Sequence, residues 1–234
     1  PIELMKKYGA DGVRAGMLFS APAGNDLLFD QKLCEQGRNF SNKLWNAFRL
    51  IKTLEVTDEG KDQSLATDWI NSRFNEVLNE VEDHFSKYRI SDALLSLYTF
   101  IWDDFCSWYL EIIKDNSISD KTYKGTLVVL DKILKTLHPF MPFITEELWN
   151  QIDDDRGYIM LSDYPTPEKF DDSLNNDFKK IFEIVTGLRK LKSDNKIKQI
   201  DVVEVMVNKK SEFDFIKYRD CLLYTSDAAD DSLR

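Results

Sequence analysis

Long stretches of this chain place apolar residues three and four positions apart, which is the spacing of one face of an α-helix. The clearest of these stretches predict helices over about 31–54, 65–88, 92–115, 121–137 and 172–192. The helix at 92–115 is apolar on most sides, so we expect it to lie at the centre of the others. Amphipathic helices around one apolar helix predict an antiparallel helix bundle.

Helix-breaking and helix-capping residues predict where these helices begin and end. Gly9 is expected to end a short first helix, and the prolines Pro139 and Pro142 are expected to separate 121–137 from a shorter helix. The polar stretch 56–64 interrupts the pattern between the first two long helices. Side-chain oxygens that could cap the helices following them are found at Asp11, Asp30 and Ser91.

The pattern changes after the acidic segment 153–155. Short apolar runs at 158–161 and 200–207 predict strands, and the second run is rich in valine. The predicted fold is therefore mainly α: an antiparallel helix bundle at 30–155, followed by a linker and a small, partial α/β unit at 156–220.

The overall composition describes a globular, acidic protein. The 234 residues are 43% hydrophobic and 31% charged, and 41 acidic residues outnumber 31 basic ones, for a net charge of −10. Such a charge argues against non-specific DNA binding by the whole surface. The three cysteines lack metal or redox spacing, which favours a reducing, cytoplasmic setting. No apolar run approaches the roughly 18 residues that span a bilayer, so we expect no membrane partner.

Against this acidic background, residues 37–52 contain four basic residues, three asparagines and no acidic residue. On a helical wheel, the apolar residues of this stretch fall on one face, which is expected to pack into the bundle. The opposite face carries Arg38, Asn42, Trp45 and Arg49, with Asn46 at its side. Lys43 adds a further cation to the same stretch.

These residue types suit contact with RNA, because guanidinium groups pair with phosphate, amides pair with base edges and an exposed indole can stack on an unpaired base. A second basic island at 187–199 includes only one acid, whereas 53–83 holds nine acids and two bases. The candidate residues of this island are Arg189, Lys190, Lys192, Lys196 and Lys198. The alternative is a solvated helix face with Trp45 half-buried, together with lysines that serve solubility.

Other groupings of reactive residues predict ordinary structural roles. Adjacent carboxylates, as at Asp103–Asp104, point about 100° apart on a helix and do not converge on one atom, so a solvated face is expected. His138, which precedes a proline, is expected to be a partly buried hydrogen-bonding residue. Cys106 is expected to be a small core residue of the apolar helix.

Several segments are similar to one known family. RNFSNKLWNAFRLI at 38–51 closely resembles the start of the anticodon-binding helical domain of valyl-tRNA synthetase, a class I aminoacyl-tRNA synthetase. KYGADGVR at 7–14 resembles the segment that follows the KMSKS loop of these enzymes. LHPFMPFITEELW at 137–149 would alone identify only the class I group, whereas 24–47 is the valyl-specific part. The resemblance covers about 1–210.

This resemblance implies a full-length enzyme that attaches valine to its tRNA with ATP and Mg and edits mischarged tRNA. Residues 1–29 would then be the end of the connection from the catalytic core, followed by the anticodon-binding bundle. The chain contains neither an HIGH-type motif nor KMSKS, so we expect it to bind no cofactor and to be inactive alone. The tail at 221–234 does not resemble the continuation of the family, and is either foreign or divergent.

The partner implied by the resemblance is valine tRNA, bound at its anticodon stem-loop by a monomer in the cytoplasm, and DNA is not expected as a partner. A second hypothesis from another class is a non-catalytic helical protein–protein interaction module, with Trp45 as the central contact.

Overall fold

The structure is a computed structural model, and it describes residues 2–21, 29–114, 117–196, 213–219 and 221–222. The strand expected at 200–207 lies outside the described residues, and so does most of the tail.

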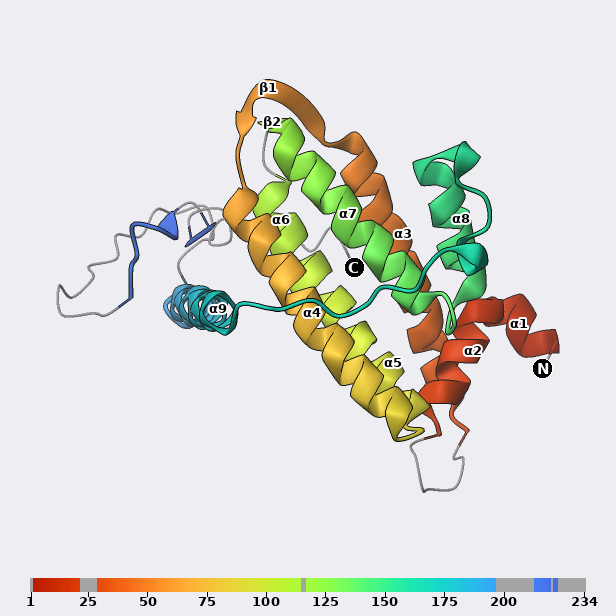
Figure 1. Ribbon diagram of the computed structural model, residues 1–234. Coiled ribbons are helices and arrows are strands. Elements are labelled where there is room, and N and C mark those ends of the chain that lie inside the picture. The colour runs from red at the N-terminus through yellow and green to blue at the C-terminus, as the bar shows by residue number, and fades with distance from the viewer. Residues whose placement is uncertain (1, 22–28, 115–116, 197–212, 220, 223–234) are drawn as a thin grey trace.

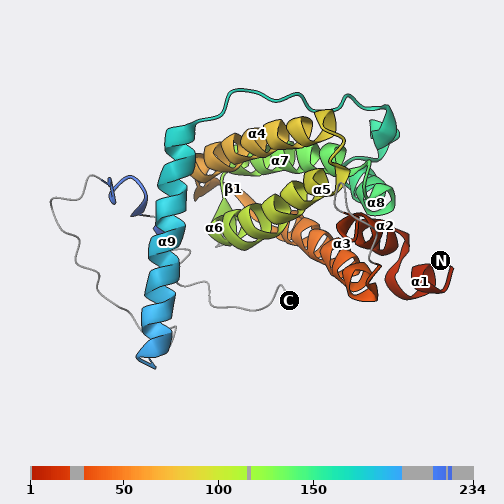
Figure 2. The same ribbon diagram turned by 90° about the horizontal axis from the view of Figure 1, so that it is seen from below.

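The predicted helix bundle is confirmed. The expected long helices are present with ends within a few residues of prediction, and the proline pair separates two helices as expected. The surrounding helices are α3 (Gln31–Thr53), α4 (Ser64–Ser86), α7 (Asp120–Leu137) and α8 (Pro142–Ile152). Figure 1 shows α4 and α7 side by side along the bundle, with α8 at one edge, and Figure 2 shows α3 on the other side of the central helix.

The apolar helix occupies the centre, as its composition predicts. It is formed by α5 (Ile90–Thr99), a π-helical stretch η1 (Phe100–Tyr109) and α6 (Leu110–Ile113). Tyr109 is fully buried, and its hydroxyl lies 2.7 Å from Thr126 Oγ1 and 3.1 Å from Thr67 Oγ1. The one polar atom of this side chain is therefore satisfied by α7 and α4. Cys106 is also buried, as expected.

Two short helices, α1 (Ile2–Tyr8) and α2 (Ala10–Phe19), pack against α3 at the N-terminal end. Gly9 has φ 77° and ends α1, as predicted. Gly16 allows α2 and α3 to approach closely, because a Cβ atom there would lie 2.6 Å from the backbone of Cys34.

The prediction that Asp11 caps α2 is wrong. Gly9 occupies the N-cap position, and the Asp11 carboxylate instead accepts hydrogen bonds from the backbone N–H groups of Phe143, at 3.3 Å, and Ile144, at 2.7 Å. Asp11 thus satisfies the first turn of α8, where the helix dipole also favours a negative charge. Sequence spacing cannot reveal this, because the two partners are 132 and 133 residues apart.

The other two cap predictions have opposite outcomes. Asp30 is confirmed, since its side chain accepts a 2.9 Å hydrogen bond from Lys32 N at the start of α3. Ser91 is wrong, because α5 begins at Ile90 and the Ser91 hydroxyl donates to the Ala21 carbonyl. The serine therefore joins the central helix to the end of α2.

Two segments differ from the predicted strand pattern. The polar stretch after α3 includes a strand, β1 (Glu55–Lys61), which pairs in parallel with β2 (Ser117–Ile118). The strand predicted at 158–161 is wrong, since η3 (Ile159–Leu161) is a 3-10 turn that follows η2 (Asp154–Arg156). Of the apolar run that suggested a strand, only Ile159 is buried against the bundle, and its three neighbours in the run are exposed.

An extended linker carries the chain from η3 to α9 (Asp172–Asp194) and is fixed to α4 by hydrogen bonds. Asn75 Oδ1 accepts from Glu168 N at 3.1 Å, and Ser72 Oγ accepts from Asp171 N at 2.7 Å. Helix α9 then lies across one end of the bundle, seen along its axis in Figure 1 and from its side in Figure 2.

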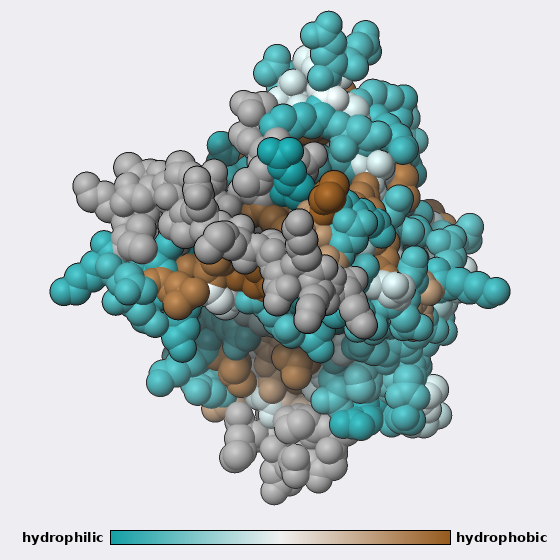
Figure 3. Space-filling view, turned by 90° about the vertical axis from the view of Figure 1, so that its left-hand side faces the viewer, coloured by the Kyte–Doolittle hydropathy of each residue, from teal (hydrophilic) through white to brown (hydrophobic). Residues whose placement is uncertain are grey.

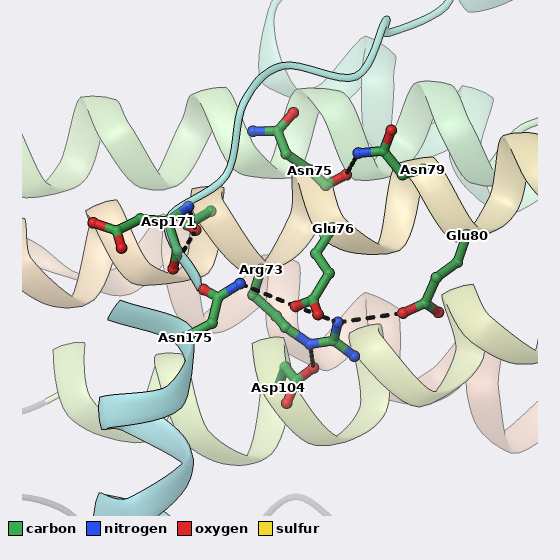
Figure 4. A network of polar contacts seen from close by, with 9 residues as sticks. Arg73, Asn75, Glu76, Asn79, Glu80, Asp104, Asp171 and Asn175 are labelled. Atoms are coloured by element: carbon green, nitrogen blue, oxygen red, sulfur yellow. Dashed lines mark hydrogen bonds and ion pairs between the residues drawn. The ribbon is translucent and has the colours of Figure 1, made fainter. Parts of the chain in front are cut away.

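A charged network joins α4 to the central helix and to α9 (Figure 4). The Arg73 guanidinium lies 3.0 Å from Asp104, 2.9 Å from Glu76 and 3.6 Å from Glu80. Asn175 of α9 donates a 3.0 Å hydrogen bond to Glu76. Burial raises the pKa of Asp104 to about 6, against the opposing effect of Arg73. The expected solvated face is therefore wrong for Asp104.

Asp104 should make the stability of the protein fall as the pH rises. Its pKa in the folded protein lies above the ordinary value of 3.8, so its stabilising contribution is complete below about pH 4 and is lost as the pH rises through about 6. We expect the free energy of unfolding of the wild type, relative to Asp104→Asn, to fall by about 1–2 kcal/mol between pH 4 and 7. Urea denaturation across this range measures the difference.

A matched control is Asp83→Asn, because the hydrogen bond from Lys87 lowers the pKa of Asp83 instead of raising it. The free energy of unfolding of the wild type, relative to Asp83→Asn, should therefore not fall between pH 4 and 7. The prediction would be contradicted if the free energy of unfolding changed equally with pH in the wild type and in Asp104→Asn between pH 4 and 7.

The turn between α4 and α5 provides a second prediction. Tyr88 has φ 57° and is 87% exposed. Hydrogen bonds from Tyr88 N to Phe85 O and from Arg89 N to His84 O form a helix end in which glycine is usual at the tyrosine position. Tyr88→Gly should therefore raise the free energy of unfolding by about 0.5–1 kcal/mol, because a Cβ atom is strained at positive φ.

Thermal denaturation measures this change, and Tyr88→Ala is the control. Alanine keeps the Cβ atom and should not bring the gain. A loss of stability in Tyr88→Gly would show that the tyrosine ring supports the fold.

Candidate nucleic-acid interface

Helix α3 presents one apolar and one polar face, as the sequence predicts. The apolar residues Phe40, Leu44, Ala47 and Ile51 are at most 1% exposed and belong to the core. On the polar side, Asn42 and Arg49 are exposed, and so is Asn39 beside them. The described residues thus bring two amides and one guanidinium to the outer face of α3.

Arg38 is only half-exposed and has a neighbour that the sequence stretch 37–52 did not include. Its guanidinium lies 3.8 Å from Glu35, one turn earlier on α3, and 5.8 Å from the centre of the Tyr8 ring of α1. The Nε atom is buried and has no hydrogen-bond partner among the described residues. Arg38 therefore stands at the border between α1 and the exposed face, with its charge partly compensated.

The structure places Lys43 away from the exposed face. Its side chain is only 9% exposed, and its ammonium lies 5.2 Å from the centre of the Trp102 ring of η1. The helical wheel could not exclude Lys43, because the position of η1 along that side of α3 is a property of the tertiary structure.

Trp45 and Asn46 are half-buried, and Trp45 packs against the core. The indole therefore has part of its surface available for stacking, and the rest contributes to the bundle. The exposed contact set on α3 is consequently narrower than the sequence predicted.

The residues of the basic island on α9 also differ in their exposure to solvent. Lys190 and Lys196 are exposed, and Lys192 and Arg189 are half-buried. The Arg189 guanidinium lies 5.5 Å from the centre of the Trp108 ring, and burial lowers its pKa while Glu111 opposes the shift. Lys198 lies outside the described residues.

The two basic elements lie towards the same side of the molecule. In Figure 2, α3 forms the lower boundary of the bundle and the C-terminal end of α9 reaches past the bundle on that side. On the side where α9 lies, the described residues that are visible are mostly hydrophilic, with hydrophobic ones gathered towards the middle of the view (Figure 3). The arrangement can offer an RNA two separate basic helices on one side.

A depression of about 540 Å³ lies elsewhere, between α7, the end of α8 and the linker. Its charges are largely paired: Asp131 with Lys135, at 3.0 Å, and with Arg156, and Lys132 with Glu168 at 3.5 Å. In the described part of the chain, no three His, Cys, Asp or Glu side chains are arranged to hold a metal ion. No described helix could cross a membrane.

Comparison with known proteins identifies the family. The family described as the anticodon-binding domain of tRNA ligase matches residues 67–207, more than half of the chain, and the chain therefore belongs to it. Valine–tRNA ligase of Christiangramia forsetii is 46% identical over 205 residues, which cover 84% of this chain and 23% of that protein.

The valine–tRNA ligase of Phocaeicola vulgatus is 47% identical over 214 residues, and that of Bacteroides thetaiotaomicron is 45% identical over 236 residues. The matches cover 88% and 95% of this chain. The chain spans 24% and 27% of these two relatives, about a quarter of their length. The resemblance that the sequence suggested is thus confirmed.

The contrast between Lys43 and Arg49 can be tested through stability. Lys43→Ala removes a buried aliphatic stem and a cation over an indole, so the free energy of unfolding should fall by about 1–2 kcal/mol. Lys43→Met keeps the stem and should lose less, and Arg49→Ala should stay within about 0.5 kcal/mol of the wild type. Urea denaturation at pH 7 compares the three variants. Equal losses for Lys43→Ala and Arg49→Ala would contradict the assigned burial.

Proposed function

We propose that this chain is the tRNA-binding part of a valine–tRNA ligase and that α3 contacts the anticodon stem-loop of valine tRNA. The observation that carries the proposal is the outer face of α3, where exposed amides and a guanidinium stand in a stretch without acidic residues, within a protein of net charge −10. The family match and the names of the relatives support the same partner.

In the proposed complex, each exposed residue type has a distinct role. The Arg49 guanidinium pairs with a phosphate of the loop, and the Asn42 and Asn46 amides pair with base edges. The exposed part of Trp45 is available for a base, and base–aromatic stacking contributes about 1–3 kcal/mol per base. The buried face of α3 keeps these groups rigid, which lowers the entropy lost on binding.

We further propose that the full-length enzyme attaches valine with ATP and Mg in parts that this chain does not include, as a cytoplasmic monomer. The chain alone is then catalytically inactive. Its two histidines support this assignment. His138 is partly buried, and its Nδ1 lies 2.7 Å from Thr145 Oγ1, as expected for a structural histidine. His84 belongs to the last turn of α4.

Filter binding of a valine tRNA transcript tests the proposal. Arg49→Ala should weaken binding about tenfold, since a hydrogen bond to a charged group contributes about 1.5–3 kcal/mol, part of which water replaces. The slope of log K against log salt should also become shallower by about one, because one phosphate contact is lost. Asn42→Ala should weaken binding with little change in this slope.

The matched control is Lys124→Ala, which removes one exposed cation from α7, a helix on the opposite side of the bundle from α3. The control should bind as the wild type does. Unchanged affinity in both Arg49→Ala and Asn42→Ala would overturn the contact face. A chain that binds no tRNA but binds a protein partner without salt dependence would favour the interaction module instead.

A further inference from the structure

The indole of Trp108 on η1 contacts two residues of α9 that are seven positions apart. Phe182 stacks on it, with ring centres 4.1 Å apart and planes 16° from parallel. Arg189 lies over the same indole at 5.5 Å. Residues seven positions apart lie on one face of a helix, about two turns from each other. Trp108 therefore contacts α9 at two points, and Arg189 is the point nearer the basic end of the helix.

The N-terminal half of α9 is held to the bundle by several contacts besides the stack of Phe182 on Trp108. Asn175 donates to Glu76 of α4 (Figure 4), and Phe178 stacks on Trp69 with ring centres 4.6 Å apart. Phe178, Ile181 and Val185 are buried. In contrast, no residue of 186–194 is buried.

The half of α9 beyond Val185 thus depends on partly exposed contacts, and the contact of Arg189 with Trp108 is one of them. A helix end with few buried contacts opens locally at low cost in free energy. This half carries Arg189, Lys190 and Lys192 against one acid, Asp194. It is also the part that reaches past the bundle on the side of α3.

We propose that Trp108 is a positioning residue, which holds residues 186–194 of α9 in place through Phe182 and Arg189 as a second RNA-contacting element beside α3. The inference rests on the proposed function and adds to it which part of the RNA each helix contacts. Helix α3 contacts the loop, and the basic half of α9 contacts the phosphate backbone. Trp108 itself touches no RNA.

The test is a salt series of tRNA binding with four variants. Trp108→Ala and the double variant Lys190→Ala/Lys192→Ala should each make the slope of log K against log salt shallower by about one to two, because phosphate contacts of α9 are lost. Adding Trp108→Ala to the double variant should change the slope no further. Trp108→Phe keeps an aromatic partner for Phe182 and should remain close to the wild type.

A structural readout separates positioning from direct contact. In Trp108→Ala, backbone amides of 186–194 should exchange hydrogen faster without RNA, while those of 174–185 keep their protection. Should Trp108→Ala fail to fold, Phe182→Leu removes the same stack from the side of α9, together with the edge-on contact of Phe182 with Trp69. It should give the same change of salt slope and the same faster exchange at 186–194.

The inference is overturned if Trp108→Ala and Phe182→Leu leave the salt slope unchanged, or if their effects add fully to those of the lysine variant. If Trp108→Ala and Phe182→Leu leave the salt slope unchanged while Arg49→Ala weakens tRNA binding, this inference fails and the proposed function stands. If Arg49→Ala is silent as well, or the wild type binds no tRNA, the proposed function fails and this inference falls with it.

Discussion

The rest of the structure depends on burial of the central apolar helix formed by α5, η1 and α6. Its side chains fill the space between α3, α4 and α7, and hydrophobic burial is the main favourable contribution to folding. Tyr109 shows how a polar group enters this core at little cost, because Thr67 and Thr126 both lie within hydrogen-bond distance of its hydroxyl. With this helix in place, α3 has one buried face, and its opposite face must meet solvent or a partner.

Polar contacts then determine how the outer segments attach to the core. Asp11 joins α2 to the first turn of α8, and Arg73 joins α4 to the central helix. The linker is fixed through Ser72 and Asn75, so α9 begins at a defined place on α4. Burial removes water from around a carboxyl group and disfavours its charged form, so the pKa of Asp104 is raised. The same network that stabilises the position of α9 thus responds to pH.

The candidate interface combines a rigid element with a less buried one. Helix α3 is anchored along its length by apolar side chains, whereas α9 is anchored mainly in its first half. Rigid groups lose little entropy on binding, and electrostatic contacts to phosphate tolerate some motion of the cations. A division between base recognition on α3 and backbone contact on α9 is consistent with this difference in burial.

The sequence by itself determined the long helices, the buried face of α3, the cap at Asp30 and the family, because helical periodicity, local capping and a matching segment are encoded in neighbouring residues. The tertiary structure alone decided that the Lys43 ammonium lies over the Trp102 ring, that Asp11 caps α8 and that Asp104 pairs with Arg73. It also replaced the strand expected at 158–161 with a turn. The physical reason is common to these cases: whether a polar side chain meets water or a partner depends on which distant helix packs beside it, and no local pattern contains that information.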